Sequence, residues 1–257
     1  MSTPAFLARL KTAQRCLFGT WVKLPTLETL ELLANAGLDF VTIDTEHAPL
    51  SLESAYKLIA HAQALGMSAL VRTPDQASND IQRLLDSGAD GLLVPRVRNA
   101  AEARHAVGRM LFSPGGQRGL GITSRAGRWG LKPLEEYLAD GNERVLRCVQ
   151  LEDRAVLEDV EAVLDVEGVN AAFLGMGDLQ LTSGLPASHG DLQALVDRLQ
   201  AACRARQIPC GAAAQDAAAA LRSAARGFSF VMVSNDATLF GKAAASLGNE
   251  LRRGLSA

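Results

Sequence analysis

The sequence predicts a (β/α)8 barrel with parallel strands, and three observations lead to that fold class. Short apolar runs alternate strictly with longer segments of helical period along the chain, which is typical of a parallel sheet covered by helices. A helix, a glycine, a short polar stretch and an apolar strand recur in AGLDFVTI, LGMSALV, SGADGLLV and RGFSFVMV. The length of 257 residues suits one such barrel. The repetition favours closure into a barrel over an open, doubly wound sheet.

Strands are expected wherever a short run is rich in β-branched or aliphatic residues. Several of these runs are apolar throughout, as expected when both faces of a strand are covered. The expected strands, in chain order, are residues 18–24, 40–44, 68–72, 91–95, 145–152, 171–175, 209–213 and 228–234.

Helices are expected between these strands because apolar residues recur there with helical period. Glycine follows several of the helical runs, and it tolerates the left-handed conformation that commonly ends a helix. The expected helices are residues 27–36, 52–65, 77–87, 100–110, 155–164, 191–206, 216–226 and 238–251.

Two segments stand outside this alternation. Residues 1–16 mix apolar and basic side chains and predict an additional amino-terminal helix lying on a surface. Residues 112–142 form one long irregular stretch between the fourth and fifth strands, and loops of that size are usually functional. The SPGGQRGLG segment within this stretch offers backbone N–H groups and Arg118 to an anion.

The composition excludes several classes of protein. With 48% hydrophobic residues and a formal net charge of −2, the chain has enough apolar residues for a core and no basic excess for nucleic-acid binding. No apolar run reaches the ~20 residues that span a bilayer, and the amino terminus lacks the apolar stretch of a signal peptide. The four cysteines show no CxxC spacing, which favours reduced, buried thiols. We therefore expect a single cytoplasmic domain spanning residues 1–257, with no nucleic-acid or membrane partner.

Polar side chains gather at the carboxyl ends of the expected strands, where barrels of this type carry their active sites. Each of these residues also has a structural explanation, since an acid after a strand can cap the next helix and an arginine can serve an ordinary ion pair. Their convergence on one rim predicts an active site. The rim residues are Trp21, Lys23, Asp44, His47, Arg72, Gln150, Glu152, Gly177 and Asp178.

The chemistry of these residues favours a divalent metal and an oxyanion. Glu152 and Asp178 are hard oxygen ligands on adjacent strands, and they favour Mg²⁺ or Mn²⁺ over structural zinc. A metal together with Arg72 would stabilise an enolate, and His47 could move a proton. Either Asp44 or Asp86 could hold His47 by a hydrogen bond. The turn at residues 175–178 lacks the third glycine of GxGxxG, so a dinucleotide site is not expected.

Seven motifs together resemble the HpcH/HpaI aldolases from about Phe18 to Asp236. They are FGTW, IDTEHAP, VRTP, LLDSGADGLLVPRV, PGGQRGLG, CVQLED and FLGMGDLQLTSG, and their order makes the match specific. The resemblance implies a (β/α)8 barrel and a class II pyruvate aldolase that depends on Mg²⁺, Mn²⁺ or Co²⁺. It also implies a homo-oligomer, usually a hexamer built as a trimer of dimers, whose last helix is exchanged between neighbouring subunits.

The resemblance also implies roles for individual residues. It assigns the metal to Glu152 and Asp178, and contacts with the pyruvate unit to Gln150 and the backbone of Gly177 and Asp178. His47 would be the acid/base, Asp86 its orienting partner, Arg72 the stabiliser of enolate charge and Trp21 a wall of the aldehyde pocket. Met176, Gln180 and the featureless AAAQDAAAA segment depart from the family pattern, and they leave the acceptor aldehyde open.

The expected reaction is reversible cleavage of a 4-hydroxy-2-oxo acid into pyruvate and an aldehyde through a metal-stabilised pyruvate enolate. Three alternatives remain at this point. Lys23, near a strand end, could support Schiff-base chemistry instead. A lyase of the malyl-CoA or citryl-CoA type would need a basic anchor, for which Arg118, Arg125 and Arg128 are the candidates. A non-catalytic barrel acting as a binding module is the third.

Overall fold

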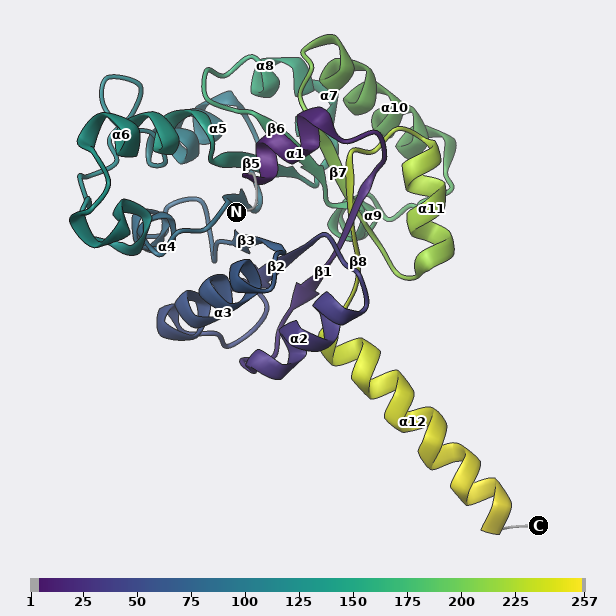
Figure 1. Ribbon diagram of the computed structural model, residues 1–257. Helices are drawn as coiled ribbons and strands as arrows, with labels where there is room; N and C mark the ends of the chain where they lie inside the picture. The colour runs from purple at the N-terminus through teal and green to yellow at the C-terminus, as the bar shows by residue number, and fades with distance from the viewer. Residues whose placement is uncertain (1–4, 256–257) are drawn as a thin grey trace.

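Eight parallel strands close into a barrel in which each strand pairs with the next and β8 pairs with β1 (Figure 1). The computed structural model describes residues 5–255. The strands are β1 (Leu17–Val22), β2 (Phe40–Asp44), β3 (Ser68–Arg72), β4 (Gly91–Val94), β5 (Leu146–Leu151), β6 (Ala171–Leu174), β7 (Cys210–Ala214) and β8 (Phe230–Asn235). Every expected strand is confirmed in its expected order, and the closed barrel is confirmed over the open sheet.

Helices surround the barrel and connect consecutive strands, so the amino and carboxyl ends of the strands form two separate rims (Figure 1). The expected helix at residues 155–164 is divided in two at Asp159, whose backbone leaves the helical region at φ −127° and ψ 35°. The helices after β1 to β8 are α2 (Leu27–Asn35), α3 (Leu52–Ala64), α4 (Asp80–Asp86), α5 (Ala100–Gly108), α7 (Arg154–Glu158), α8 (Val160–Leu164), α9 (Met176–Ser183), α10 (Gly190–Ala205), α11 (Ala217–Ala225) and α12 (Asp236–Leu255).

The expected amino-terminal helix is present as α1 (Phe6–Thr12), and it lies across the amino-terminal end of the barrel with its apolar side buried and its polar side exposed. Phe6 is fully buried, with its ring 4.8 Å from that of Phe40 and 5.8 Å from that of Phe230. Gly211 leaves the room for Phe230, because a Cβ at that position would lie 2.3 Å from the phenylalanine ring. Apolar burial inside the barrel end therefore fixes α1.

The long stretch 112–142 is a folded excursion that lies beside the amino-terminal rim rather than an open loop. It contains the short helix η1 (Arg125–Gly130) and leads into α6 (Leu134–Glu143), where Tyr137 is buried against Phe112. Arg118 is also buried, lies over the Phe112 ring at 4.5 Å and donates to Asp86 Oδ1 at 2.7 Å. The expectation that Arg118 would be offered to an anion at the active-site rim is therefore wrong.

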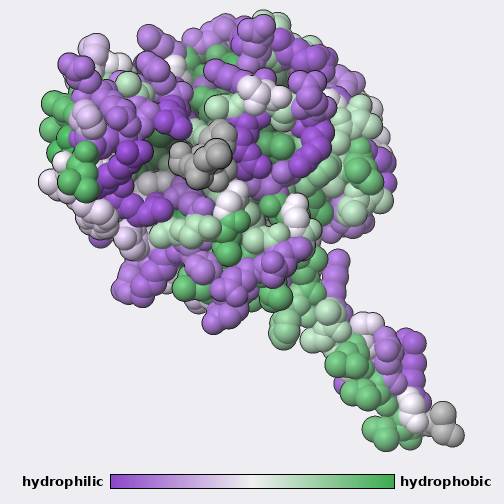
Figure 2. Space-filling model, viewed as in Figure 1, coloured by the Kyte–Doolittle hydropathy of each residue, from purple (hydrophilic) through white to green (hydrophobic). Residues whose placement is uncertain are grey.

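Helix α12 extends away from the barrel and carries apolar side chains along one side (Figures 1 and 2). These exposed side chains are Leu239, Phe240, Leu247, Leu251 and Leu255. Within residues 5–255, no helix is long and apolar enough to cross a membrane. Cys148, Cys203 and Cys210 are buried free thiols, whereas Cys16 is half-buried.

Candidate functional site

An ion pair between the ends of two neighbouring strands organises the carboxyl-terminal rim. The last residues of β2 and β3, Asp44 and Arg72, stand opposite each other in the sheet register. Arg72 donates from Nε to Asp44 Oδ1 at 2.9 Å and from a terminal nitrogen to Oδ2 at 2.8 Å. Burial raises the pKa of Asp44, but the hydrogen bonds and charges of Arg72 and Lys23 outweigh it and lower that pKa to about 2. Asp44 is therefore a permanent anion that fixes the Arg72 guanidinium.

Three further side chains complete the setting of Arg72. Its guanidinium lies over the Trp21 ring at 4.2 Å, a cation–π geometry, and Trp21 is only 9% exposed. Its remaining terminal nitrogen lies 3.1 Å from Glu46 Oε2. Lys23 Nζ bonds to Asp44 Oδ2. Because an ion pair holds its amine, Lys23 is not presented as the free nucleophile that Schiff-base chemistry needs.

His47 stands at the same rim with its ring in solvent. The side chain is 60% exposed, and Nε2 lies 3.6 Å from Glu46 Oε2. Asp44 Oδ1 accepts the backbone N–H of His47 at 3.1 Å and makes no bond to its ring. The expectation that Asp44 holds the imidazole is therefore wrong in this conformation. Glu46, which sequence reasoning did not single out, is the acid beside His47, and its place in the IDTEHAP segment was the available signal.

The structure does not bring Asp86 to His47 of the same chain. Asp86 is the last residue of α4, which runs from the end of β3 back toward the start of β4, so it lies near the amino-terminal rim. Its Oδ1 accepts from Arg118 at 2.7 Å and from the Tyr137 hydroxyl at 3.3 Å. The pairing of Asp86 with His47 stays a prediction, and within a single chain the two residues do not meet.

Glu152 follows β5 as a buried carboxylate without a cationic side chain bonded to it among residues 5–255. Its Oε1 accepts the backbone N–H of Arg96 at 2.8 Å, and its Oε2 accepts from Gln150 Nε2. Burial and the nearby charge of Asp178 raise the pKa of Glu152 to about 7. A Cβ at Gly175 would lie 2.6 Å from Glu152 Oε2, so the absence of a side chain there lets this carboxylate fit.

Asp178 joins Glu152 at the wall of a cavity of about 470 Å³. It lies in the first turn of α9, a helix that the sequence reading treated only as a glycine turn. Arg96 also lines this cavity and adopts a left-handed backbone at φ 55°, a conformation that costs energy for any residue except glycine and is concentrated at functional sites. Arg96 stands at the end of the fourth expected strand, but nothing local in the sequence marks its conformation or gives it a role.

The residues present fit a divalent cation. Glu152 and Asp178 face one cavity whose lining also includes Asp75 and Asp153, and burial, with the nearby charges of Asp178 and Glu46, raises the pKa of Glu152 to about 7. The buried Gln150 Oε1 has no hydrogen-bond partner in the part of the chain that the structure describes, and it is a further oxygen donor. No group of three or more histidine, cysteine, aspartate or glutamate side chains in residues 5–255 is placed to hold a metal ion by itself, so substrate or water would supply the other ligands.

The basic residues that could anchor a CoA ester are remote from this cavity. Arg118, Arg125 and Arg128 belong to the excursion at the amino-terminal rim and line a different cavity there. These three arginines are therefore not the anchor that a CoA-ester lyase would need beside Glu152, where the basic lining residues are Arg96 and Arg98.

The chain was compared with known proteins. A family model described as HpcH/HpaI aldolase/citrate lyase matches residues 17–243. A 2-keto-3-deoxy-L-rhamnonate aldolase from Salmonella paratyphi B is 34% identical over 228 residues, covering 88% of this chain and 85% of that protein. A solved HpcH/HpaI aldolase/citrate lyase family protein from Burkholderia cenocepacia is 30% identical with a TM-score of 0.88, covering 97% of this chain and 100% of the other. The solved structure of an HpcH/HpaI aldolase from Desulfitobacterium hafniense is 27% identical with a TM-score of 0.88, covering 96% of this chain and 97% of the other.

Proposed function

The chain belongs to the HpcH/HpaI aldolase/citrate lyase family and is a carbon–carbon lyase of the aldolase type, and we propose that it reversibly cleaves a 4-hydroxy-2-oxo acid into pyruvate and an aldehyde. One observation carries this proposal. The Arg72–Asp44 pair and the Glu152–Asp178 carboxylates meet at the same rim, joined through Glu46 and Arg96. A fixed cation beside an uncompensated pair of acids suits a substrate that develops negative charge on its oxygens.

Glu152 and Asp178 would hold a divalent cation, which we propose to be Mg²⁺, Mn²⁺ or Co²⁺. When bound, such an ion would supply Lewis-acid stabilisation of negative charge on substrate oxygens. The raised pKa of Glu152 and the free buried oxygen of Gln150 support this assignment.

The side chains of the rim would position the substrate and move its proton. Arg72, oriented by Asp44 and Glu46, would hydrogen-bond the oxygen on which the enolate charge develops. Gln150 and the backbone of Gly177 and Asp178 would hold the carboxylate of the pyruvate unit. A Cβ added at Gly177 would meet no atom within 4 Å, so the space beside this backbone is open. His47, whose ring is exposed, would take the proton of the 4-hydroxyl group as the C3–C4 bond breaks and return it in the reverse direction.

The aldehyde half would lie on the side of Trp21, whose ring backs Arg72. A sugar-derived aldehyde is compatible with the name of the Salmonella relative, 2-keto-3-deoxy-L-rhamnonate aldolase. Met176 and Gln180 lie on α9, the helix that carries Asp178, and we propose that these departures from the family pattern affect the choice of aldehyde.

The proposed reaction predicts metal-dependent exchange of the C3 protons of pyruvate, since an enolate forms reversibly at that carbon. With Mg²⁺, Mn²⁺ or Co²⁺, the ¹H NMR methyl signal of pyruvate in D₂O is expected to fade at least about a hundredfold faster than with EDTA. A panel of aldehydes with pyruvate then identifies the acceptor by product analysis. Exchange that persists in EDTA, together with trapping of pyruvate on the protein by borohydride, would show a Schiff-base enzyme instead.

We also propose that the chain forms a homo-oligomer, a hexamer built as a trimer of dimers, in which α12 is exchanged between neighbouring copies. The support is the apolar stripe of α12, which extends from the barrel and leaves Phe240, Leu247 and Leu251 more than half exposed (Figure 2). A second copy of this chain carries the same uncovered apolar helix, so the two copies could cover each other's apolar side chains.

The double substitution Leu247→Glu/Leu251→Glu is therefore expected to convert the oligomer into smaller species in size-exclusion chromatography with light scattering. Buried glutamates without partners would destabilise an apolar interface by several kcal/mol. Lys242→Glu, on the opposite side of the same helix, is the matched control and should leave the oligomer intact. An unchanged mass for the double variant would contradict the exchange of α12.

A further inference from the structure

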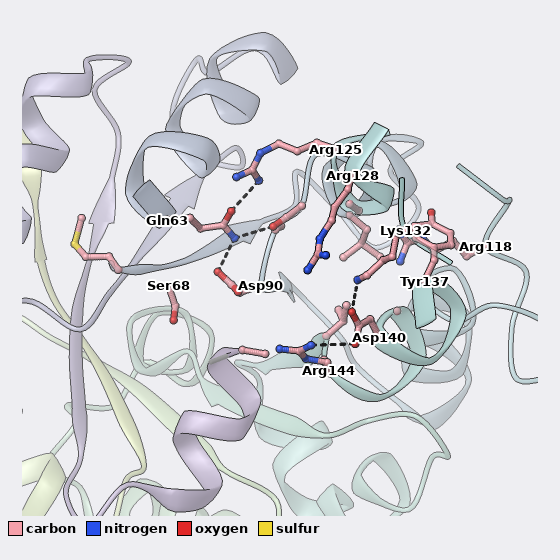
Figure 3. Close-up of a pocket in the computed structure, with 18 residues that line it drawn as sticks. Gln63, Ser68, Asp90, Arg118, Arg125, Arg128, Lys132, Tyr137, Asp140 and Arg144 are labelled. Atoms are coloured by element: carbon pink, nitrogen blue, oxygen red, sulfur yellow. Dashed lines mark hydrogen bonds and ion pairs between the residues drawn. The ribbon is translucent and has the colours of Figure 1, made fainter. Parts of the chain in front are cut away.

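A second cavity, of about 440 Å³, lies at the amino-terminal rim, on the opposite side of the barrel from Glu152. The starts of β3 and β4 form one wall through Ser68 and Asp90, and the excursion containing η1 and α6 forms the other (Figure 3). Asp86 does not line this cavity. The aldolase reaction described above makes no use of it.

The lining of this cavity is strongly cationic. Its charged members are five basic side chains, Arg118, Arg125, Arg128, Lys132 and Arg144, and two carboxylates, Asp90 and Asp140. Arg118 is already paired at 2.7 Å with Asp86, which lies outside the lining. Asp140 is already shared by Lys132 and by Arg144, which donates at 3.1 Å. Asp90 accepts from Gln63 Nε2 at 2.9 Å and from the backbone N–H of Ala69 at 2.8 Å, and no arginine or lysine side chain donates to it among residues 5–255.

Two of the arginines have no carboxylate partner among residues 5–255. Arg125 donates only to neutral oxygens, to Gln63 Oε1 at 2.7 Å and to the Ser87 carbonyl at 3.0 Å. The Arg128 guanidinium makes no hydrogen bond or ion pair with any described residue, and it extends into the cavity toward Asp90 and Lys132 (Figure 3). Arginine presents several donors in a planar fork, so both side chains retain capacity for an anion.

The backbone that presents Arg128 is strained. Arg128 and Trp129 both adopt left-handed conformations, at φ 50° and φ 58°, and neither is a glycine. Two successive residues of this kind are costly, and such strain is found at ligand-binding segments. Trp129 remains exposed, so burial of the tryptophan does not account for the conformation. What the conformation achieves is the direction of Arg128 into the cavity.

We propose that this cavity is a binding site for a small dianion, a phosphate ester or a dicarboxylate, held by Arg128 and Arg125. The unpaired guanidinium, the excess of basic side chains and the strained segment that aims one of them converge on that chemistry. The cavity volume suits a small metabolite rather than a chain of nucleotides. The site does not depend on the aldolase assignment.

Isothermal titration calorimetry of the full chain with inorganic phosphate and, separately, with succinate tests the site. At least one of the two anions is expected to bind, and the one that does identifies phosphate or carboxylate as the group recognised. Arg128→Gln should weaken that binding by about tenfold or more, because it removes a charge-assisted donor. Arg222→Gln, an exposed arginine on α11, is the matched control and should bind like the natural chain.

Arg128→Gly keeps the test valid if the glutamine variant folds poorly. Glycine accepts φ 50° without strain, so this variant should melt no lower than the natural chain and still lose binding. The proposal is overturned if neither anion binds above a chloride control of equal ionic strength, or if both Arg128 variants bind as the natural chain does.

Discussion

Glu152→Gln is expected to remove divalent-metal binding and to lower aldol turnover by about a thousandfold or more, the scale at which a lost metal ion acts in catalysis. Gln keeps the shape of the side chain, and it can still accept the backbone N–H of Arg96 through its amide oxygen. The change removes a buried negative charge that no described side chain neutralises. The metal-free variant should therefore melt at a higher temperature than the metal-free natural chain.

Two measurements separate this outcome from simple damage to the fold. Differential scanning fluorimetry should show a higher melting temperature for the metal-free variant and no further rise when Mn²⁺ is added. Asp216→Asn is the matched control, because Asp216 caps α11 through the N–H of Ala219 at 2.7 Å, does not line the cavity, and asparagine caps equally well. A Glu152→Gln protein that still gains stability from Mn²⁺ would disprove this metal site.

The strands were predictable because their signal is local. An apolar run between polar segments looks the same whether the sheet is open or closed. The repeated order of helix, glycine and strand is what favoured the barrel. The helix α1 was expected, but the surface that it covers was not, because its periodicity is that of any amphipathic helix. Nothing in residues 6–12 tells whether Phe6 faces an outer surface or the interior of a barrel end.

Two helices were missed for different reasons. Helix α9 was missed because Gly175 and Gly177 read as a turn and because Leu179 is its only buried side chain, so the helix has almost no apolar periodicity. In α6, the apolar face rests on Tyr137 and Gly141 beside many charges, and the sequence reads as polar loop. Both helices depend on tertiary contacts, and the helix propensities of their residues carry no information about those contacts.

The site was predictable as far as topology determines it. Parallel strands bring their carboxyl ends to one rim, so Asp44, Arg72, Glu152 and Asp178 had to share a side of the barrel. Which of them touch was not predictable. The pairing of Arg72 with Asp44 follows from the register of β2 and β3, and the contact of Asp86 with Arg118 follows from the fold of the excursion.

His47 and Asp86 lie at opposite rims of the barrel, and this separation leads to a second prediction, on the turnover of variants at these two positions. The family resemblance assigns Asp86 to orient His47, but the two residues lie at opposite rims of one chain. In a homo-oligomer the assignment requires Asp86 of one copy to meet His47 of another. We expect His47→Ala to lower turnover by about a hundredfold to ten-thousandfold as an acid/base loss, and Asp86→Asn to lower it by a smaller factor. Asparagine is chosen because it retains an acceptor for buried Arg118.

Mixed oligomers of these two variants should recover activity that neither has alone. If the pair forms between copies, random mixing in a symmetric oligomer places intact His47 opposite intact Asp86 at about a quarter of the sites. If the pair formed within one chain, every site would keep one defect and mixing would restore nothing. The control is a mixture of His47→Ala with Glu152→Gln, because both residues belong to the same rim of one barrel and should give no recovery. Recovery in the control but not in the first mixture would place the metal between copies and return Asp86 to a structural role beside Arg118 and Tyr137.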